Sequence, residues 1–226
     1  MNNINIAIDG PSGAGKSTLA KAFAKKHGFI YVDTGALYRS IGLYAQRKGV
    51  SLEGIEATVE LLPEIKLELR FENNAQSVIL NGENVNDYIR TPEISMYASA
   101  VSAIAAVRSF LLDLQRSIAA ENNVIMDGRD IGTVILPNAQ IKIFLSASAE
   151  ARAQRRFEEL VNKGIATTFE EVLKDMEIRD RNDSTRKTAP AIPAEDAIFI
   201  DNSKESVEET VVKIESIAKE KLGYAI

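Results

Sequence analysis

A glycine-rich segment at residues 10–17 constrains the fold of this chain more than any other feature. It reads GPSGAGKS and fills every fixed position of the phosphate-loop pattern G-x-x-x-x-G-K-[ST]. An apolar run at residues 4–8 precedes it and a helical pattern follows it, which is the context that the pattern requires. Glycines allow several backbone amide groups to converge on one phosphate, and a helix that begins near Lys16 presents its positive end. The segment therefore predicts a domain that binds a nucleoside triphosphate.

The same segment supplies the first candidate site residues. We expect Lys16 to act in catalysis as a mobile positive charge and the Ser17 hydroxyl to be a ligand of Mg²⁺. A glycine-rich turn that matches by chance is the alternative, and the strand and helix on either side argue against it. The residues predicted to surround the triphosphate are Gly10, Pro11, Ser12, Gly13, Ala14, Gly15, Lys16, Ser17 and Thr18.

Composition limits the classes of protein to consider. The 226 residues, 45% of them hydrophobic, allow one sizeable domain with or without a small insertion. The net charge of −5 argues against a nucleic-acid partner, and the absence of cysteine excludes disulfides. The first residues lack a basic signal-peptide region, and the weakly polar stretch at residues 97–107 is too short for a membrane span. We therefore expect a soluble cytoplasmic protein without a membrane partner, and nothing in the sequence demands more than a monomer.

Short apolar runs alternate with helical patterns along the chain. Runs of this kind are typical of central parallel strands, so the alternation predicts an α/β fold of three layers around a parallel sheet. The runs lie at residues 4–8, 29–32, 124–126, 141–145 and 197–200, and the helical patterns at residues 19–24, 149–161 and 207–222.

Residues 63–90 break this alternation. Apolar residues at 65, 67, 69 and 71 alternate with charged ones, which is the period of a strand. A polar turn at residues 72–76 and a second apolar run lead to Asn81-Gly82, a pair typical of hairpin turns. The segment predicts a small antiparallel insertion that is placed to close over a second substrate, and a hairpin without such a role is the alternative.

Two polar clusters follow predicted strands. Residues 33–39 read DTGALYR, with Asp33 or Thr34 as the expected cap of a helix, and residues 127–133 read DGRDIGT. Because ligands bind beyond the carboxyl ends of parallel strands, both clusters should lie near the phosphate loop. For Asp-Gly-Arg, a turn held by an ion pair is the alternative.

Arginines concentrate in a third region. Arg152, Arg155 and Arg156 share one face of a predicted helix, and residues 179–187 read RDRNDSTRK before a proline-containing loop. Arginine suits bidentate phosphate binding, and these arginines outnumber the carboxylates close to them in the sequence. We interpret the region as a lid that folds arginines onto transferring phosphates, with a solvated, salt-bridged surface as the alternative.

These motifs resemble bacterial cytidylate kinases, within the nucleoside monophosphate kinase family of P-loop proteins. The resemblance covers essentially the whole chain and implies ATP, Mg²⁺ and an acceptor that is CMP or dCMP. It also implies a P-loop kinase domain over residues 1–226, with an antiparallel monophosphate-binding insertion at about 63–90, a lid at about 152–190 and a core of 1–62, 91–178 and 191–226. The matching stretches are residues 8–18, 33–39, 127–134, 137–156 and 179–190.

The resemblance further implies roles for individual residues. Ser99, Arg108 and Asp130 would read the cytosine, Arg179 and Asp183 would reach the sugar, and the other substrate-binding residues would hold the acceptor nucleotide and its phosphate. Arg186 would be a lid arginine on the phosphates. The implied catalytic residues are Lys16, Arg129 and Arg186, and the implied substrate-binding residues are Ser12, Thr34, Tyr38, Arg39, Ser99, Arg108, Gly128, Arg129, Asp130, Arg179 and Asp183.

Other classes of P-loop protein fit less well. A guanine-nucleotide switch needs Asn-Lys-x-Asp, whereas Asn162-Lys163 continues with Gly-Ile. An ATPase that remodels a partner would lack an acceptor-phosphate pocket, and Arg39 and Arg129 argue against it. A kinase for another small acceptor stays open, because it would keep every part except the base-reading residues. We do not expect the sole histidine, His27, to be catalytic, since it lies at the end of the first predicted helix, away from every cluster.

Overall fold

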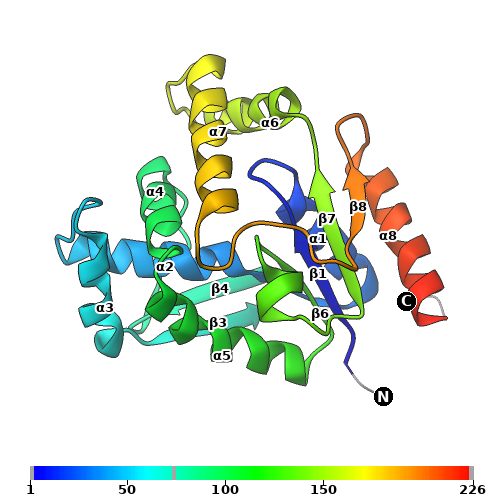
Figure 1. Ribbon diagram of the computed structural model, residues 1–226, viewed down its shortest axis with the longest axis horizontal. Helices are drawn as coiled ribbons and strands as arrows, with labels where there is room; N and C mark the ends of the chain where they lie inside the picture. The colour runs from blue at the N-terminus through cyan, green and yellow to red at the C-terminus, as the bar shows by residue number, and fades with distance from the viewer. Residues whose placement is uncertain (1–2, 73–74, 224–226) are drawn as a thin grey trace.

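The computed structural model describes residues 3–72 and 75–223, and a five-stranded parallel sheet forms its centre (Figure 1). The strands stand in the order β2-β6-β1-β7-β8. Each strand predicted from an apolar run is present, so the predicted α/β fold with a central parallel sheet is confirmed. The bounds are β1 (Asn5–Asp9), β2 (Ile30–Asp33), β6 (Val124–Asp127), β7 (Ile141–Ser146) and β8 (Ile198–Asp201).

Helices cover both faces of this sheet, because successive side chains of a strand point to opposite faces. Ile6 and Ile8 of β1 pack in one cluster with α1 and α8, whereas Ala7 between them packs in another with α5 and η3. The helices and helical turns are α1 (Lys16–His27), α2 (Thr34–Arg47), η1 (Ile55–Ala57), α3 (Thr58–Leu61), η2 (Leu62–Glu64), α4 (Pro92–Val101), α5 (Ala105–Glu121), η3 (Ile131–Ile135), α6 (Ala149–Asn162), α7 (Phe169–Thr185) and α8 (Val207–Leu222).

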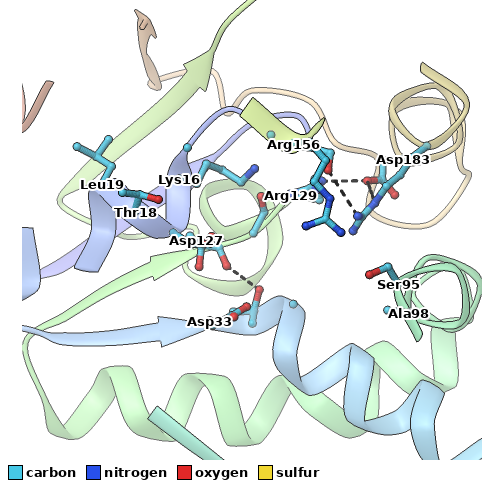
Figure 2. Close-up of a pocket in the computed structure, with 18 of the residues that line it drawn as sticks. Lys16, Thr18, Leu19, Asp33, Ser95, Ala98, Asp127, Arg129, Arg156 and Asp183 are labelled. Atoms are coloured by element: carbon cyan, nitrogen blue, oxygen red, sulfur yellow. Dashed lines mark hydrogen bonds and ion pairs between the residues drawn. The ribbon is translucent and has the colours of Figure 1, made fainter. Parts of the chain in front are cut away.

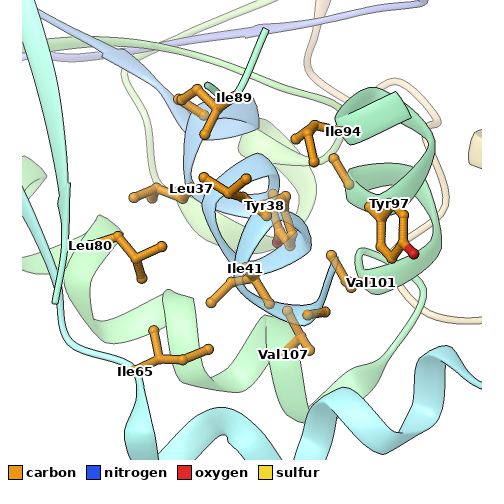
Figure 3. Close-up of a cluster of buried hydrophobic side chains, with 14 of the residues drawn as sticks. Leu37, Tyr38, Ile41, Ile65, Leu80, Ile89, Ile94, Tyr97, Val101 and Val107 are labelled. Atoms are coloured by element: carbon orange, nitrogen blue, oxygen red, sulfur yellow. The ribbon is translucent and has the colours of Figure 1, made fainter. Parts of the chain in front are cut away.

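The segment with strand periodicity forms a separate antiparallel sheet of β3 (Leu67–Glu72), β4 (Ala75–Leu80) and β5 (Glu83–Asn84). Asn81 and Gly82 join β4 to β5 with φ angles of +49° and +88°, as the hairpin pair predicts. Two residues of the polar turn predicted at 72–76 lie outside the described residues. Val78 and Leu80 pack in one hydrophobic cluster with α2, α4 and α5 (Figure 3). The small sheet therefore shares a core with the helices around it.

Helices α6 and α7 lie beyond the carboxyl end of the parallel sheet (Figure 1). The Ser148 hydroxyl caps α6, and Thr168 with Glu171 forms a capping box at the start of α7. The two helices pack against each other through a cluster that includes Leu160 and Met176. The chain leaves α7 into an irregular segment that carries the prolines, as predicted.

No single helix within the described ranges is both long and apolar enough to cross a membrane. Helices α4 and α5 meet the length and composition test only as a pair, with a bend of 98° between them.

Because the small sheet and the helices around it share one hydrophobic cluster, a cavity in that cluster should lower the stability of the protein. Ile41 of α2 is fully buried in this cluster. We expect Ile41→Ala to lower the free energy of unfolding by about 2–5 kcal/mol, because it leaves a cavity. Val212→Ala is the control, because Val212 is 55% exposed and its loss should change stability by less than about 0.5 kcal/mol. Urea unfolding measures both, and equal effects would contradict the cluster's role.

Candidate active site

A cavity of about 670 Å³ lies between the carboxyl ends of the parallel strands and helices α6 and α7 (Figure 2). All predicted site residues except Gly10, Pro11 and Ala14 line it. Ala14 is buried, and Pro11 borders a second cavity of about 280 Å³. The predicted residues in its wall are Ser12, Gly13, Gly15, Lys16, Ser17, Thr18, Thr34, Tyr38, Arg39, Ser99, Arg108, Gly128, Arg129, Asp130, Arg179, Asp183 and Arg186.

Glycine allows the phosphate loop to pass closely under its neighbours. Gly10 has a φ of +145°, and a Cβ there would lie 2.0 Å from the carbonyl oxygen of Leu145. Gly13 has a φ of +73°, and a Cβ there would lie 2.6 Å from Cε of Met176 in α7. Helix α1 begins directly after this loop, at Lys16, as the sequence predicts. A side chain at Gly10 would therefore meet the backbone of β7. One at Gly13 would meet the Met176 side chain and the Arg152 carbonyl oxygen of α6, 3.0 Å away.

Lys16 lies in the loop with its ammonium group enclosed by protein. Its Nζ donates to the carbonyl oxygen of Pro11 at 2.6 Å. Burial and the nearby Arg129 guanidinium lower the pKa of Lys16, and the Asp127 carboxylate opposes that shift. The lysine charge is therefore poorly solvated, which strengthens its interaction with an anion that enters the cavity.

Asp127 ends β6 and faces the start of α1. Its Oδ2 accepts from Ser17 Oγ at 2.9 Å, and its Oδ1 accepts from the Tyr31 hydroxyl at 2.9 Å. Burial and the neighbouring Asp33 carboxylate raise the pKa of Asp127, a shift that a bound cation would oppose. Asp127 was not among the metal ligands predicted from the sequence, although its position directly after a buried strand is a signal for it.

The donor set of Ser17 and Asp127 fits Mg²⁺. This ion prefers oxygen ligands and usually takes one or two from the protein, with the rest from phosphates and water. Within residues 3–72 and 75–223, no group of three or more His, Cys, Asp or Glu residues is arranged to hold a metal ion by itself. A cation held by Ser17 and Asp127 would take its further ligands from phosphates or water.

Arg108 and Asp130 form a buried ion pair near the connection between α4 and α5. Arg108 also donates to the Ser102 carbonyl oxygen at 3.1 Å, and its guanidinium lies 5.4 Å from the centre of the Tyr38 ring. Ser99 of α4 lines the same cavity. The pair thus combines hydrogen-bond donors and acceptors in a place shielded from water.

Arg186 reaches the same ion pair from the end of α7. Its Nη1 donates to Ser102 Oγ at 2.9 Å, and its Nη2 lies 3.8 Å from Asp130 Oδ1. Burial and the Arg108 guanidinium lower the pKa of Arg186. The side chain therefore lies beside Asp130 in this structure, and its role on the transferring phosphates stays a prediction.

Asp183 of α7 gathers three arginines. Its Oδ2 accepts from Arg129 Nε at 2.9 Å and lies 3.9 Å from Arg179 Nε, and its Oδ1 lies 3.7 Å from Arg186 Nη1. Burial raises the pKa of Asp183, but the arginines outweigh it and hold that pKa below its usual range. Burial and Arg129 lower the pKa of Arg179 to about 10. One carboxylate thus pairs with guanidinium groups from separate segments of the chain.

Asp33 joins α2 to the small antiparallel sheet. Its Oδ1 accepts from the Ala36 amide at 3.0 Å, so it is the predicted helix cap. Its Oδ2 accepts from Arg90 at 3.1 Å, and Arg39 Nη1 lies 3.7 Å from Oδ1. The Gln76 side chain of β4 accepts from the Asp33 amide at 2.8 Å. Although burial raises the pKa of Asp33, Arg39 and Arg90 lower it overall. The sequence analysis missed Arg90 and Gln76.

The three arginines of α6 do not act alike. Arg155 and Arg156 line the cavity, whereas Arg152 does not. Nη1 of Arg152 donates to the Ser12 carbonyl oxygen at 2.9 Å and to Asp180 Oδ2 at 2.5 Å. Arg152 thus joins the phosphate loop to α7 in this structure, and the expectation that it contacts the transferring phosphates stays a prediction.

The family model that matches this chain and two of its relatives carry the same description. The family described as Cytidylate kinase matches residues 6–220. A cytidylate kinase of Caldicellulosiruptor saccharolyticus is 47% identical over 226 residues, or 100% of both chains. A cytidylate kinase of Caldanaerobacter subterraneus is 50% identical over 221 residues, or 97% of both. The crystal structure of an uncharacterized protein from Eubacterium ventriosum has a TM-score of 0.55 at 15% identity, over 96% of this chain and 99% of its own, and supports the fold alone.

The arginines around Asp183 predict a large effect when its charge is removed. We expect Asp183→Asn to lower the free energy of unfolding at pH 7 by about 3–5 kcal/mol, because guanidinium groups lose their buried counter-charge. The folded-state pKa is below the unfolded one, so this difference should be constant above about pH 5 and shrink as the pH falls further. Urea unfolding at several pH values measures it. Asp113→Asn, at an exposed position, is the control, and a difference that grew in acid would contradict the assignment.

Proposed function

The chain belongs to the cytidylate kinase family, and we propose that it transfers the γ-phosphoryl group of ATP to CMP or dCMP. The products would be ADP and CDP or dCDP. The observation that carries this proposal is a single cavity that joins a phosphate loop to the buried Arg108–Asp130 pair. The loop suits a nucleoside triphosphate, and the pair suits the edge of a cytosine.

The donor end would hold ATP with Mg²⁺. Backbone amides of the phosphate loop and the Lys16 ammonium would bind the phosphates, with the positive end of α1 directed at them. Ser17 and Asp127 would hold the cation, which would neutralise charge on the phosphate oxygens.

The acceptor end would select the base. Cytosine carries an amine donor at C4 and acceptors at N3 and O2, so Asp130 would accept from the amine while Arg108 and Ser99 donate. Uracil has a carbonyl at C4 and an N–H at N3. It would leave buried charged groups mispaired, at a cost of about 2–4 kcal/mol. We therefore propose a preference for CMP over UMP.

Arginines between the two ends would orient the acceptor. Arg39 and Arg129 would bind its phosphate, and Arg179 and Asp183 would contact its sugar. The attacking atom is then a phosphate oxygen that is already ionised at neutral pH, so the reaction requires no strong general base.

Catalysis would rest on positioning and charge. The transition state of phosphoryl transfer is loose and places negative charge on the oxygens of the moving group. Lys16, Arg129 and Arg186 would stabilise that charge, and α6 with α7 would close over the cavity to exclude water.

We further propose that the protein works as a cytoplasmic monomer on small molecules, with no nucleic-acid or membrane partner. The net charge of −5 supports the absence of a nucleic-acid partner. A kinase for another small acceptor is the competing function, and it would keep the donor end unchanged.

A coupled assay of ADP release with ATP and Mg²⁺ tests the proposal. We expect strong turnover with CMP and dCMP, weak turnover with UMP, and none with AMP, GMP or TMP. Lys16→Met is the control for activity at this site and should reduce turnover at least about 100-fold. Turnover with another monophosphate, or ADP release without an acceptor, would contradict the assignment of Ser99, Arg108 and Asp130.

Asp130→Asn tests the base-reading role directly. The amide keeps one acceptor oxygen, which Arg108 also needs, and presents a donor to the cytosine amine, so kcat/KM for CMP should fall at least about tenfold more than kcat/KM for UMP. Steady-state kinetics with both acceptors at saturating ATP measure the two losses. Equal losses would show that Asp130 maintains structure and does not read the base.

A further inference from the structure

Asp9 is a buried carboxylate at the junction of β1 and the phosphate loop, and it does not line the cavity. Its side chain binds the segment that follows β6. Oδ1 accepts from the Ile131 amide at 2.7 Å, and Oδ2 accepts from the Gly132 amide at 2.8 Å. These amides are the first two of η3, so Asp9 caps this helical turn from a neighbouring strand.

Asp130 occupies the position from which a residue normally caps its own helix. An aspartate there usually accepts a hydrogen bond from an amide two or three residues further on. Asp33 does this at the start of α2, where it accepts from Ala36. Asp130 makes no such bond, and its carboxylate pairs with Arg108 instead. The Gly132 amide, which lies two residues after Asp130, donates to Asp9 instead.

We infer that Asp9 is a positioning residue for recognition of the acceptor base: by capping η3 in place of Asp130, it keeps the Asp130 carboxylate directed at the base-reading end of the cavity. The inference rests on the proposed function. Strand pairing supports it, because β1 and β6 are adjacent and Gly128 donates from its amide to the Ile8 carbonyl oxygen at 3.0 Å. Asp9 thereby links the start of the donor loop to the segment that selects the acceptor.

Asp9→Asn is the test, because it keeps the shape of the side chain and leaves one acceptor oxygen for two amide donors. Asp130 is then drawn to the uncapped turn. We expect the ratio of kcat/KM for CMP to that for UMP to fall at least about tenfold, mainly through a higher KM for CMP. The KM for ATP should change less than about threefold, since the backbone of the phosphate loop is unaltered. Asp9→Ser, which also offers a single acceptor, is measured beside it and should show the same fall.

Two controls separate positioning from a general structural role. Asp201→Asn is the matched variant, because Asp201 ends β8, accepts from the Ser203 amide at 2.8 Å and is exposed away from the cavity. Its CMP-to-UMP ratio should equal that of the wild type. In the double variant Asp9→Asn/Asp130→Asn, the ratio should equal that of Asp130→Asn alone, because the effect of Asp9 passes through Asp130. Thermal unfolding establishes that each variant is folded.

The outcomes distinguish this inference from the function on which it rests. A wild-type protein without preference for CMP would overturn the proposed function and the inference together. If the wild type selects CMP and either folded Asp9 variant keeps that selectivity, the inference alone is overturned. It is also overturned if the double variant shows the product of the two single fold-reductions, because the two substitutions would then act independently.

Discussion

Three neighbouring parallel strands each end on an aspartate, and the rest of the site is arranged around that row. Asp9, Asp33 and Asp127 end β1, β2 and β6, and the strand register places Asp33 beside Asp127. Buried carboxylates so close together are costly unless each finds its own partners. Burial raises the pKa of Asp9 to about 6 and also raises that of Asp127, whereas arginines lower that of Asp33. Each aspartate has its own partner. Asp9 accepts from amides of η3, Asp33 accepts from an amide of α2 and caps that helix, and Asp127 accepts from the Ser17 hydroxyl.

Several arginines that line the cavity form ion pairs with buried carboxylates. Asp183 and Asp130 hold arginines that come from the α4–α5 region, from the end of β6 and from α7. Such pairs fix the guanidinium groups in place, so little reorganisation would be needed for the phosphate binding that we propose. His27 lies outside this network, with Nε2 at 2.8 Å from Glu215. The paired arginines that line the cavity are therefore suited to electrostatic stabilisation.

Local sequence patterns were sufficient to predict the strands and helices and the position of the residues that directly follow a strand. The loop at residues 10–17, the cap at Asp33 and the position of Arg129 all follow from the end of an apolar run, because that end fixes which edge of the sheet a residue reaches. Contacts between distant segments were not predictable in this way. Arg152 could be placed on a helix face, yet its pairing with Asp180 depends on the packing of α6 against α7. For the same reason the sequence gives no sign that Asp9, and not Asp130, caps η3.

The small antiparallel sheet shows how a contact between distant segments positions a residue of the site, because Gln76 of β4 binds Asp33. Its side chains share a core with α2, so the sheet and that helix are stabilised together. Gln76 binds the backbone of Asp33 on both sides, accepting from the amide at 2.8 Å and donating to the carbonyl oxygen at 3.3 Å, and Arg90 binds its carboxylate. Arg90 and Arg39 therefore share Asp33. If Arg39 binds the acceptor phosphate as we propose, Arg90 would still pair with the buried Asp33 carboxylate, which would lower the cost of releasing Arg39. A hairpin that only decorated the surface would supply neither the amide clamp nor this second arginine.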